Sequence, residues 1–199
     1  MSKPDITTID LLRHGELTTK GLFCALPDES LSEQGWQSLL KATDGKEWDV
    51  IISSNFKRCS SFAKVLATQH TPTEFYISEP LQEMDFGRWA GVAAKDIWQR
   101  EHKKLAELWR NPDDFISPGG ESINDFNKRV GEAIRYQLKS HQGKSILIVT
   151  HSGVIRSILA MALEISNKSA LKFNIDYAQM TRLHYYADGE FSLQSLGCS

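Results

Sequence analysis

The sequence predicts an α/β fold: a doubly wound, mostly parallel sheet with helices on both faces and a small helical cap insertion. Two short, continuous apolar runs, at residues 49–53 and 145–150, are bounded by polar residues, as in strands that are covered on both faces. Helical patterns alternate with the strand patterns, which favours parallel pairing. The 199 residues contain no internal repeat or linker, so we expect a single domain over residues 1–199.

The individual elements follow from hydrophobic periodicity and from capping signals. In chain order, they are a strand at 6–12, a helix from the N-cap Ser32 to about 42, a strand at 49–53, a helix at 57–69, a strand at 75–77, helices at 93–110 and 122–141, a strand at 145–150, a helix at 154–163, and a hairpin of strands at 181–186 and 191–194.

Capping signals and side-chain spacing give two of these helices their expected start and buried face. Ser122, with Asp125 three residues later, resembles a capping box that opens the helix to 141. In the helix at 57–69, the side chains of Phe62, Val65 and Leu66 share one face, which is expected to be buried.

Residues 84–120 interrupt the alternation of strands and helices. The segment starts with a loop-like stretch and contains the turn signals Asn111-Pro112 and Pro118-Gly119-Gly120. We expect this segment to form a cap over a site at the edge of the sheet.

Composition and charge narrow the class of partners. Hydrophobic residues make up 41% of the chain and charged residues 24%, so an ordinary globular domain with a sizeable core is expected. The formal net charge is −2 and no dense run of Lys and Arg occurs, which argues against nucleic acid or an anionic membrane as a partner. We expect a small-molecule partner, and either a monomer or a homodimer.

Cysteine usage and apolar stretches bear on the compartment. The three cysteines are far apart and form no CxxC pair, so neither a disulfide framework nor a zinc site is expected. The first residues lack the charged-then-apolar pattern of a signal peptide, and no apolar stretch approaches the ~18 residues of a membrane-spanning helix. These features predict a cytoplasmic protein with no membrane segment.

The tripeptide Arg13-His14-Gly15 lies where the first predicted strand ends. Ligands of open α/β sheets bind outside the carboxyl ends of the strands. A neutral imidazole is a good nucleophile toward phosphorus, arginine presents a planar fork that matches phosphate oxygens, and glycine allows close backbone approach. A structural histidine beside a surface arginine is the alternative, and this tripeptide alone leaves both interpretations open.

A second histidine, His151, lies at the junction between the strand at 145–150 and the next helix. Free backbone N–H groups at the start of a helix favour anions. If protonated, His151 would add positive charge next to whatever His14 attacks. An incidental histidine in an N-cap loop is the alternative, but two such junctions in one chain argue against coincidence.

Arg58 and Glu83 are two further candidates. Arg58 lies in the first turn of the helix at 57–69, where the helix dipole disfavours a cation, so it is expected to serve a ligand; a solvated surface arginine is the alternative. Glu83 is the candidate proton donor, because cleavage of a phosphate monoester by a histidine needs an acid that protonates the leaving alkoxide. Glu16 is a rival for this role on local grounds.

Other polar residues are expected to have structural roles. His70, His102 and His141 lie in polar helical contexts and are predicted at the surface. Glu121 and Ser122 would either contact substrate from the cap or cap the helix that follows.

Five elements, in chain order, resemble the histidine phosphatase superfamily, also called phosphoglycerate-mutase-like. They are LLRHGE at 11–16, SxxxxR at 53–58, PLQEMDFGRWAG at 80–91, PGGES at 118–122 and THSGV at 150–154. The resemblance covers nearly the whole chain and implies the fold of that superfamily.

The resemblance also implies a role for each matching residue. His14 would be the nucleophile that becomes phosphohistidine, and Glu83 the general acid and then the base for water. The implied phosphate-binding set is Arg13, His14, Arg58, His151 and Ser152. No metal and no cofactor are implied, because arginines and histidine supply the positive charge.

Within the superfamily, the chain is most similar to the α-ribazole-5′-phosphate phosphatases of cobalamin biosynthesis. The similarity lies in the short length, LSEQGW at 31–36, LQEMDFGRW at 81–89 and NIDYAQMTRL at 174–183. Leu17 and Lys20 depart from the Thr and Asn of many relatives, and the loop at 23–28 is altered. These departures fall on the substrate side, where Lys20, Phe23 and Trp89 are candidate contacts, with core packing as the alternative for the aromatic residues.

Three functions are compared. The first is a metal-independent phosphomonoesterase that dephosphorylates α-ribazole 5′-phosphate. The alternative is a phosphatase or mutase for sugar phosphates or phosphoglycerate. A binding module without catalysis is disfavoured, because none of the implied catalytic residues is lost.

Overall fold

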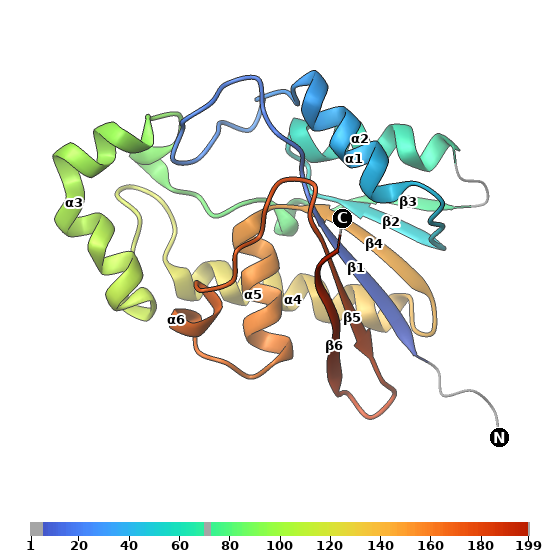
Figure 1. Ribbon diagram of the computed structural model, residues 1–199. Coiled ribbons are helices and arrows are strands. Elements are labelled where there is room, and N and C mark those ends of the chain that lie inside the picture. Colours follow the sequence, from blue (N-terminus) through green and yellow to red (C-terminus); the bar gives the residue numbers. More distant parts are fainter. Residues whose placement is uncertain (1–5, 70–72, 199) are drawn as a thin grey trace.

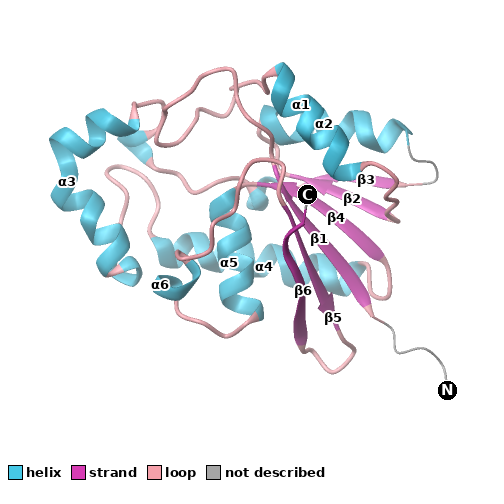
Figure 2. Cartoon of the chain, in the orientation of Figure 1, coloured by secondary structure: helices cyan, strands magenta, loops and turns pink. Residues whose placement is uncertain are grey.

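A six-stranded mixed sheet forms the middle layer of the structure, a computed structural model that describes residues 6–69 and 73–198 (Figures 1 and 2). The strands are β1 (Thr7–Arg13), β2 (Val50–Ser53), β3 (Glu74–Ile77), β4 (Ser145–Thr150), β5 (Met180–Tyr185) and β6 (Phe191–Cys198). They lie in the order β3-β2-β4-β1-β5-β6. The first four in this order pair in parallel, whereas β5 and β6 are antiparallel. The predicted mostly parallel α/β fold is confirmed.

Helices cover both faces of the sheet. They are α1 (Glu33–Thr43), α2 (Lys57–Gln69), α3 (Ala94–Arg110), α4 (Ile123–Ser140), α5 (Ser152–Ala162) and α6 (Asn167–Ala170), with the 3-10 turns η1 (Glu79–Leu81), η2 (Gly87–Trp89) and η3 (Pro112–Asp114). Helices α1 and α2 lie on one face and α4 and α5 on the other, while α3 stands apart from the sheet (Figure 1). Among the described residues, no helix is long and apolar enough to cross a membrane.

Side chains of the parallel strands alternate between two cores, as period-two geometry requires. In β1, Leu11 belongs to the cluster shared with α4 and α5, and Leu12 to the cluster shared with α1 and α2. Ile52 and Ile51 of β2 divide in the same way. Burial on both faces explains the continuous apolar runs in the sequence, and it fixes the strands that carry the site.

Both predicted N-caps are present. The hydroxyl of Ser32 accepts a hydrogen bond from the N–H of Gly35 at 3.0 Å, and that of Ser122 accepts one from the N–H of Asp125 at 3.0 Å. Helix α5 begins at Ser152, two residues before the predicted start, so that Gly153 lies in its first turn and His151 at the N-cap position.

Two predictions about single residues were wrong, and one helix was missed. Val65 is 41% exposed, so the buried face of α2 carries Phe62 and Leu66 without it. His141 is only 8% exposed, since its ring packs beside that of Tyr76 with 5.6 Å between centroids. The short helix α6 was not predicted. His102 is exposed as expected, and His70 lies outside the described residues.

Candidate active site

Three parallel strands deliver the predicted residues to one edge of the sheet. The backbone N–H of His14, directly after β1, donates to Thr150 O at 2.9 Å, and that of Ser54, directly after β2, donates to Val149 O at 3.0 Å. These bonds continue the pairing with β4 beyond the strand ends. The imidazole rings of His14 and His151 therefore lie with their centroids 5.3 Å apart.

Gly15 is required by close backbone packing. A Cβ atom at Gly15 would overlap the carbonyl of Gly35, and one at Gly35 would overlap the carbonyl of Glu16. The loop after β1 therefore lies directly against the first turn of α1. This contact holds the backbone that carries His14.

The hydrogen bonding of His14 fixes which ring nitrogen is free. Its Nδ1 lies 2.9 Å from Gly15 O, and a carbonyl oxygen only accepts, so Nδ1 carries the proton. Nε2 then holds a lone pair, and no hydrogen-bond partner for it exists among the described residues. Burial, together with the charges of Arg58 and Arg13, holds the pKa of His14 well below its usual value of 6.5. His14 is thus a neutral imidazole with an available lone pair.

His151 is buried and neutral in the free protein. Its Nδ1 accepts from Arg58 Nε at 3.3 Å, and its Nε2 lies 2.8 Å from the Ser54 hydroxyl. Arginine can only donate, so the proton of His151 is on Nε2. Burial and then Arg58 hold the pKa of His151 well below 6.5. The sequence interpretation in which a protonated His151 adds charge does not apply to this state.

Two arginines supply positive charge at the same edge. The Nη1 of Arg13 donates to Ile175 O at 2.6 Å, and its guanidinium stacks on the ring of Tyr177 at 4.0 Å from the centroid. The Nη1 of Arg58, which is 1% exposed, donates to Leu26 O at 2.8 Å. Within residues 6–69 and 73–198, neither arginine forms an ion pair with a carboxylate. One buried and one partly buried cation, neither paired with a carboxylate, make a site that fits an anion.

Glu83 lies next to this cationic group. Its carboxylate accepts from the backbone N–H of Met84 at 3.1 Å and from that of Gly153, in the first turn of α5, at 3.2 Å. The second bond uses one of the free N–H groups at the helix start. A Cβ at Gly153 would overlap Glu83 Oε1, so this glycine makes room for the carboxylate. Glu16 instead pairs with Lys20 at 2.9 Å and does not line the cavity.

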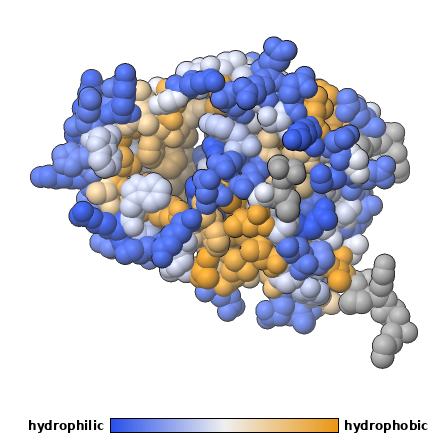
Figure 3. Space-filling view, in the orientation of Figure 1, coloured by the Kyte–Doolittle hydropathy of each residue, from blue (hydrophilic) through white to orange (hydrophobic). Residues whose placement is uncertain are grey.

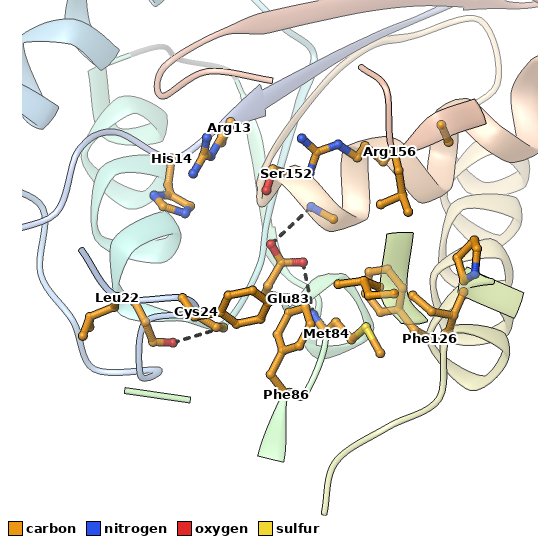
Figure 4. Close-up of a pocket in the computed structure, with 18 of the residues that line it drawn as sticks. Arg13, His14, Leu22, Cys24, Glu83, Met84, Phe86, Phe126, Ser152 and Arg156 are labelled. Atoms are coloured by element: carbon orange, nitrogen blue, oxygen red, sulfur yellow. Dashed lines mark hydrogen bonds between the residues drawn. The ribbon is translucent and has the colours of Figure 1, made fainter. Parts of the chain in front are cut away.

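A cavity of about 270 Å³ opens in front of these groups. Arg13, His14 and Ser152 lie on one side of Glu83, and Met84 and Phe86 lie on the other (Figure 4). Its apolar wall includes Phe23, Phe86, Leu108, Trp109, Phe126 and Leu171. Figure 3 shows apolar side chains in the hollow on this face, within a hydrophilic rim.

The structure places three predicted site residues away from the cavity wall. Trp89 is 1% exposed and packs behind Phe23, with 5.3 Å between ring centroids, because the loop after β1 covers it. The Lys20 ammonium is drawn to Glu16 and its side chain is 70% exposed. His151 is fully buried behind Arg58 and does not line the cavity. Phe23 does line it.

Arg156, Tyr177 and Asn127 also line the cavity and were not predicted. The Nε of Arg156 donates to Phe173 O at 3.0 Å, and burial lowers the pKa of Arg156, although an arginine keeps its charge. One signal in the sequence pointed to Arg156: it is the only charged residue in helix α5, whose other residues are apolar or small. Tyr177 and Asn127 gave no such signal.

The depressed pKa values of the two buried histidines predict how they titrate. His14 and His151 should stay neutral through pH 6.5, because protonation would place a cation beside Arg58 in a buried site. Imidazole NMR resonances, assigned with His14→Asn and His151→Asn, should therefore not shift between pH 7.5 and 6. The free energy of unfolding should fall as the pH drops below about 6.5, where the unfolded state takes up these protons.

The urea-unfolded chain is the control for this titration, since there both imidazoles should titrate near 6.5. A midpoint near 6.5 for either histidine in the folded protein would contradict the assignment of neutral rings.

Comparison with known proteins shows the family to which this chain belongs. A family model described as "Histidine phosphatase superfamily (branch 1)" matches residues 9–198. The "Bifunctional protein Rv2228c" of Mycobacterium tuberculosis is 27% identical over 194 residues, which are 94% of this chain but 53% of the relative, so the chain spans about half of that protein. A 2,3-bisphosphoglycerate-dependent phosphoglycerate mutase of Bartonella tribocorum is 27% identical over 79% of this chain and 81% of its own length.

Solved structures share the fold. The α-ribazole phosphatase of Shigella flexneri superposes with a TM-score of 0.82 at 23% identity, over 96% of each chain. The family model covers nearly all of the chain, including both histidine motifs and the strands that present them. The chain belongs to branch 1 of the histidine phosphatase superfamily.

Proposed function

We propose that this protein is a phosphomonoesterase that acts through a phosphohistidine, without a metal. One observation carries the proposal: the unprotonated Nε2 of His14 faces a cavity that is also lined by the partly buried Arg13 and the buried Arg58, and neither guanidinium has a carboxylate partner among the described residues. A dianionic phosphoryl group would supply the missing negative charge, and its phosphorus would lie within reach of the nucleophile.

In the first step, the Nε2 lone pair of His14 attacks phosphorus and the P–O ester bond breaks. Arg13, Arg58 and the Ser152 backbone at the start of α5 hold the phosphoryl oxygens. Glu83, in its acid form, gives its proton to the leaving alkoxide, so the alcohol departs neutral. His151 accepts from Arg58 Nε and thereby orients that guanidinium.

In the second step, the Glu83 carboxylate takes a proton from water. The resulting hydroxide attacks phosphorus and the P–N bond breaks, which releases inorganic phosphate and restores neutral His14. Each arginine contact is expected to contribute on the order of 1.5–3 kcal/mol, as charge-assisted hydrogen bonds do.

We propose α-ribazole 5′-phosphate, a riboside of a flat heterocycle, as the substrate. The apolar cavity wall supports this, because a heterocycle gains from apolar contact whereas phosphoglycerate does not. Residues 84–120 would act as the cap, since Phe86, Leu108, Trp109 and Pro112 from this segment line the cavity. The named activity of the Shigella protein is consistent with this choice.

A substrate panel tests this assignment. Burial of about 100 Å² of heterocycle would contribute roughly 2.5 kcal/mol, so kcat/KM for α-ribazole 5′-phosphate should exceed that for 3-phosphoglycerate, fructose 2,6-bisphosphate and O-phosphoserine by at least about tenfold. The preference should shrink in Trp109→Ala, because this half-exposed side chain lines the cavity.

Trp98→Ala is the matched control: Trp98 lies on the same helix, is 63% exposed and does not line the cavity. Equal kcat/KM values across the panel would rule out the riboside, and interconversion of 2- and 3-phosphoglycerate would favour the mutase alternative.

A further inference from the structure

Glu83 lies in a segment that has no regular secondary structure of its own. Residues 82–86, between η1 and η2, are in neither a helix nor a strand. Two backbone N–H groups donate to the Glu83 carboxylate, but these bonds do not fix the main chain of residues 82–86. Other contacts must therefore hold this backbone in place.

Arg129, on α4, binds the carbonyl groups of this segment. Its Nη1 donates to Pro80 O at 2.8 Å and to Gln82 O at 3.1 Å, and its Nη2 lies 3.5 Å from Glu83 O. One planar guanidinium thus gathers three carbonyl groups within four residues of chain. No other side chain in the described part of the molecule donates to these three oxygens.

Glu121 orients this guanidinium and also binds the backbone of Asp85, on the other side of Glu83. Its carboxylate forms a two-point pair with Arg129, at 3.0 Å to Nε and 2.8 Å to Nη2. The same carboxylate accepts from Asp85 N at 2.9 Å, and the backbone N–H of Glu121 donates to Asp85 O at 2.9 Å. The main chain is thereby held on both sides of Glu83.

Neither Arg129 nor Glu121 lines the cavity, so neither contacts a bound substrate there. Their side chains are 22% and 18% exposed, which screens the pair only in part and favours a fixed geometry. Of the two roles considered for Glu121 and Ser122, the structure shows the cap, which Ser122 forms, and it places Glu121 outside the lining of the cavity. The pair acts on the site only through the backbone that carries Glu83.

We infer that Arg129 and Glu121 are positioning residues for the proton-transfer group Glu83: they fix the 80–85 backbone so that the carboxyl meets the leaving oxygen in the first step and water in the second. This inference rests on the proposed function. A misplacement of about 1 Å at a reacting group costs on the order of 100-fold in rate.

The test compares esters whose leaving groups differ in their need for a proton. In Arg129→Met and Glu121→Gln, kcat/KM for an alkyl phosphate should fall about 10- to 100-fold more than kcat/KM for p-nitrophenyl phosphate, because nitrophenolate leaves without protonation. With the aryl ester, phosphoenzyme should accumulate as a burst, since the second step still needs the base. Arg129→Lys should recover part of the loss, because lysine keeps the charge but not the planar fork.

Arg135→Met is the matched control, because Arg135 is an exposed arginine on the same helix away from this segment. An equal loss of kcat/KM for both esters, with no burst, would overturn the inference. Arg129 and Glu121 would then only stabilise the fold. A wild-type protein that neither hydrolyses phosphate esters nor forms phosphoenzyme would instead overturn the proposed function. Thermal unfolding midpoints show whether Arg129→Met or Glu121→Gln fails to fold. In that case, the comparison of the two esters is made with Arg129→Lys.

Discussion

Replacement of His14 by asparagine is expected to abolish phosphoenzyme formation and to lower kcat by about 10⁴-fold. The amide of asparagine is similar in size to the inner part of the imidazole and fills part of the space that the His14 ring occupies. It offers no nucleophilic lone pair. Arg13 and Arg58 would remain, so the variant should still bind inorganic phosphate. The measurement is rapid acid-free quenching with ³²P-labelled substrate, in which phosphohistidine is recognised because acid, but not base, releases the label.

His102→Asn is the control for this variant, since His102 is exposed on α3, the helix that stands apart from the sheet (Figure 1). If His14→Asn turned over substrate at the wild-type rate, or still carried acid-labile phosphate, His14 would not be the nucleophile. Loss of both phosphate binding and turnover would point to collapse of the cationic site, which the phosphate titration would reveal.

The residues at the strand ends could be predicted from the sequence because their positions depend on local patterns. A buried parallel strand has a distinctive apolar run, and the residue after it must lie at the carboxyl edge of the sheet. His14 and His151 follow β1 and β4 in this way, and the two strands are neighbours. Their proximity therefore follows from topology, and the structure brings their rings to 5.3 Å.

The residues around these histidines could not be predicted as well, because their positions depend on packing between distant segments. Trp89 and Phe23 read alike in the sequence, but Phe23 covers Trp89 and only Phe23 reaches the cavity. His141 lies in a polar stretch, yet the end of α4 packs it against Tyr76 of an edge strand. The hydrophobic periodicity of one segment does not predict which distant segment will pack over its side chains.

The protonation of the two histidines also needed the structure. The sequence places His151 where a cation would help to bind phosphate, but Arg58 donates to its Nδ1, and burial with two nearby arginines disfavours a third charge. The positive charge of the free site therefore rests on arginines. In the proposed mechanism the two tasks are therefore separate: arginines, whose charge is independent of pH, would bind the anion, and a neutral histidine would attack it.

Replacement of Glu83 by glutamine is expected to lower kcat/KM for an alkyl phosphate by about 10²- to 10⁴-fold, the usual contribution of a positioned proton donor. Glutamine keeps the size and one acceptor oxygen of the side chain but carries no transferable proton. The loss for p-nitrophenyl phosphate should be much smaller, because its leaving group needs no proton. Steady-state kinetics on a series of esters with rising leaving-group pKa measures this difference as a steeper slope for the variant.

Gly153→Ala tests the same group without changing its chemistry. The new Cβ would overlap Glu83 Oε1 and displace the carboxylate, while alanine in the first turn of α5 is a better helix former than glycine. The thermal midpoint should therefore hold or rise while kcat/KM for the alkyl ester falls by about 10- to 100-fold. Gly131→Ala, whose Cβ meets only the flexible end of Arg135 on α4, is the matched control. If Glu83→Gln and Gly153→Ala each lowered kcat/KM equally for the alkyl and the aryl esters, the proton would come from a group other than Glu83.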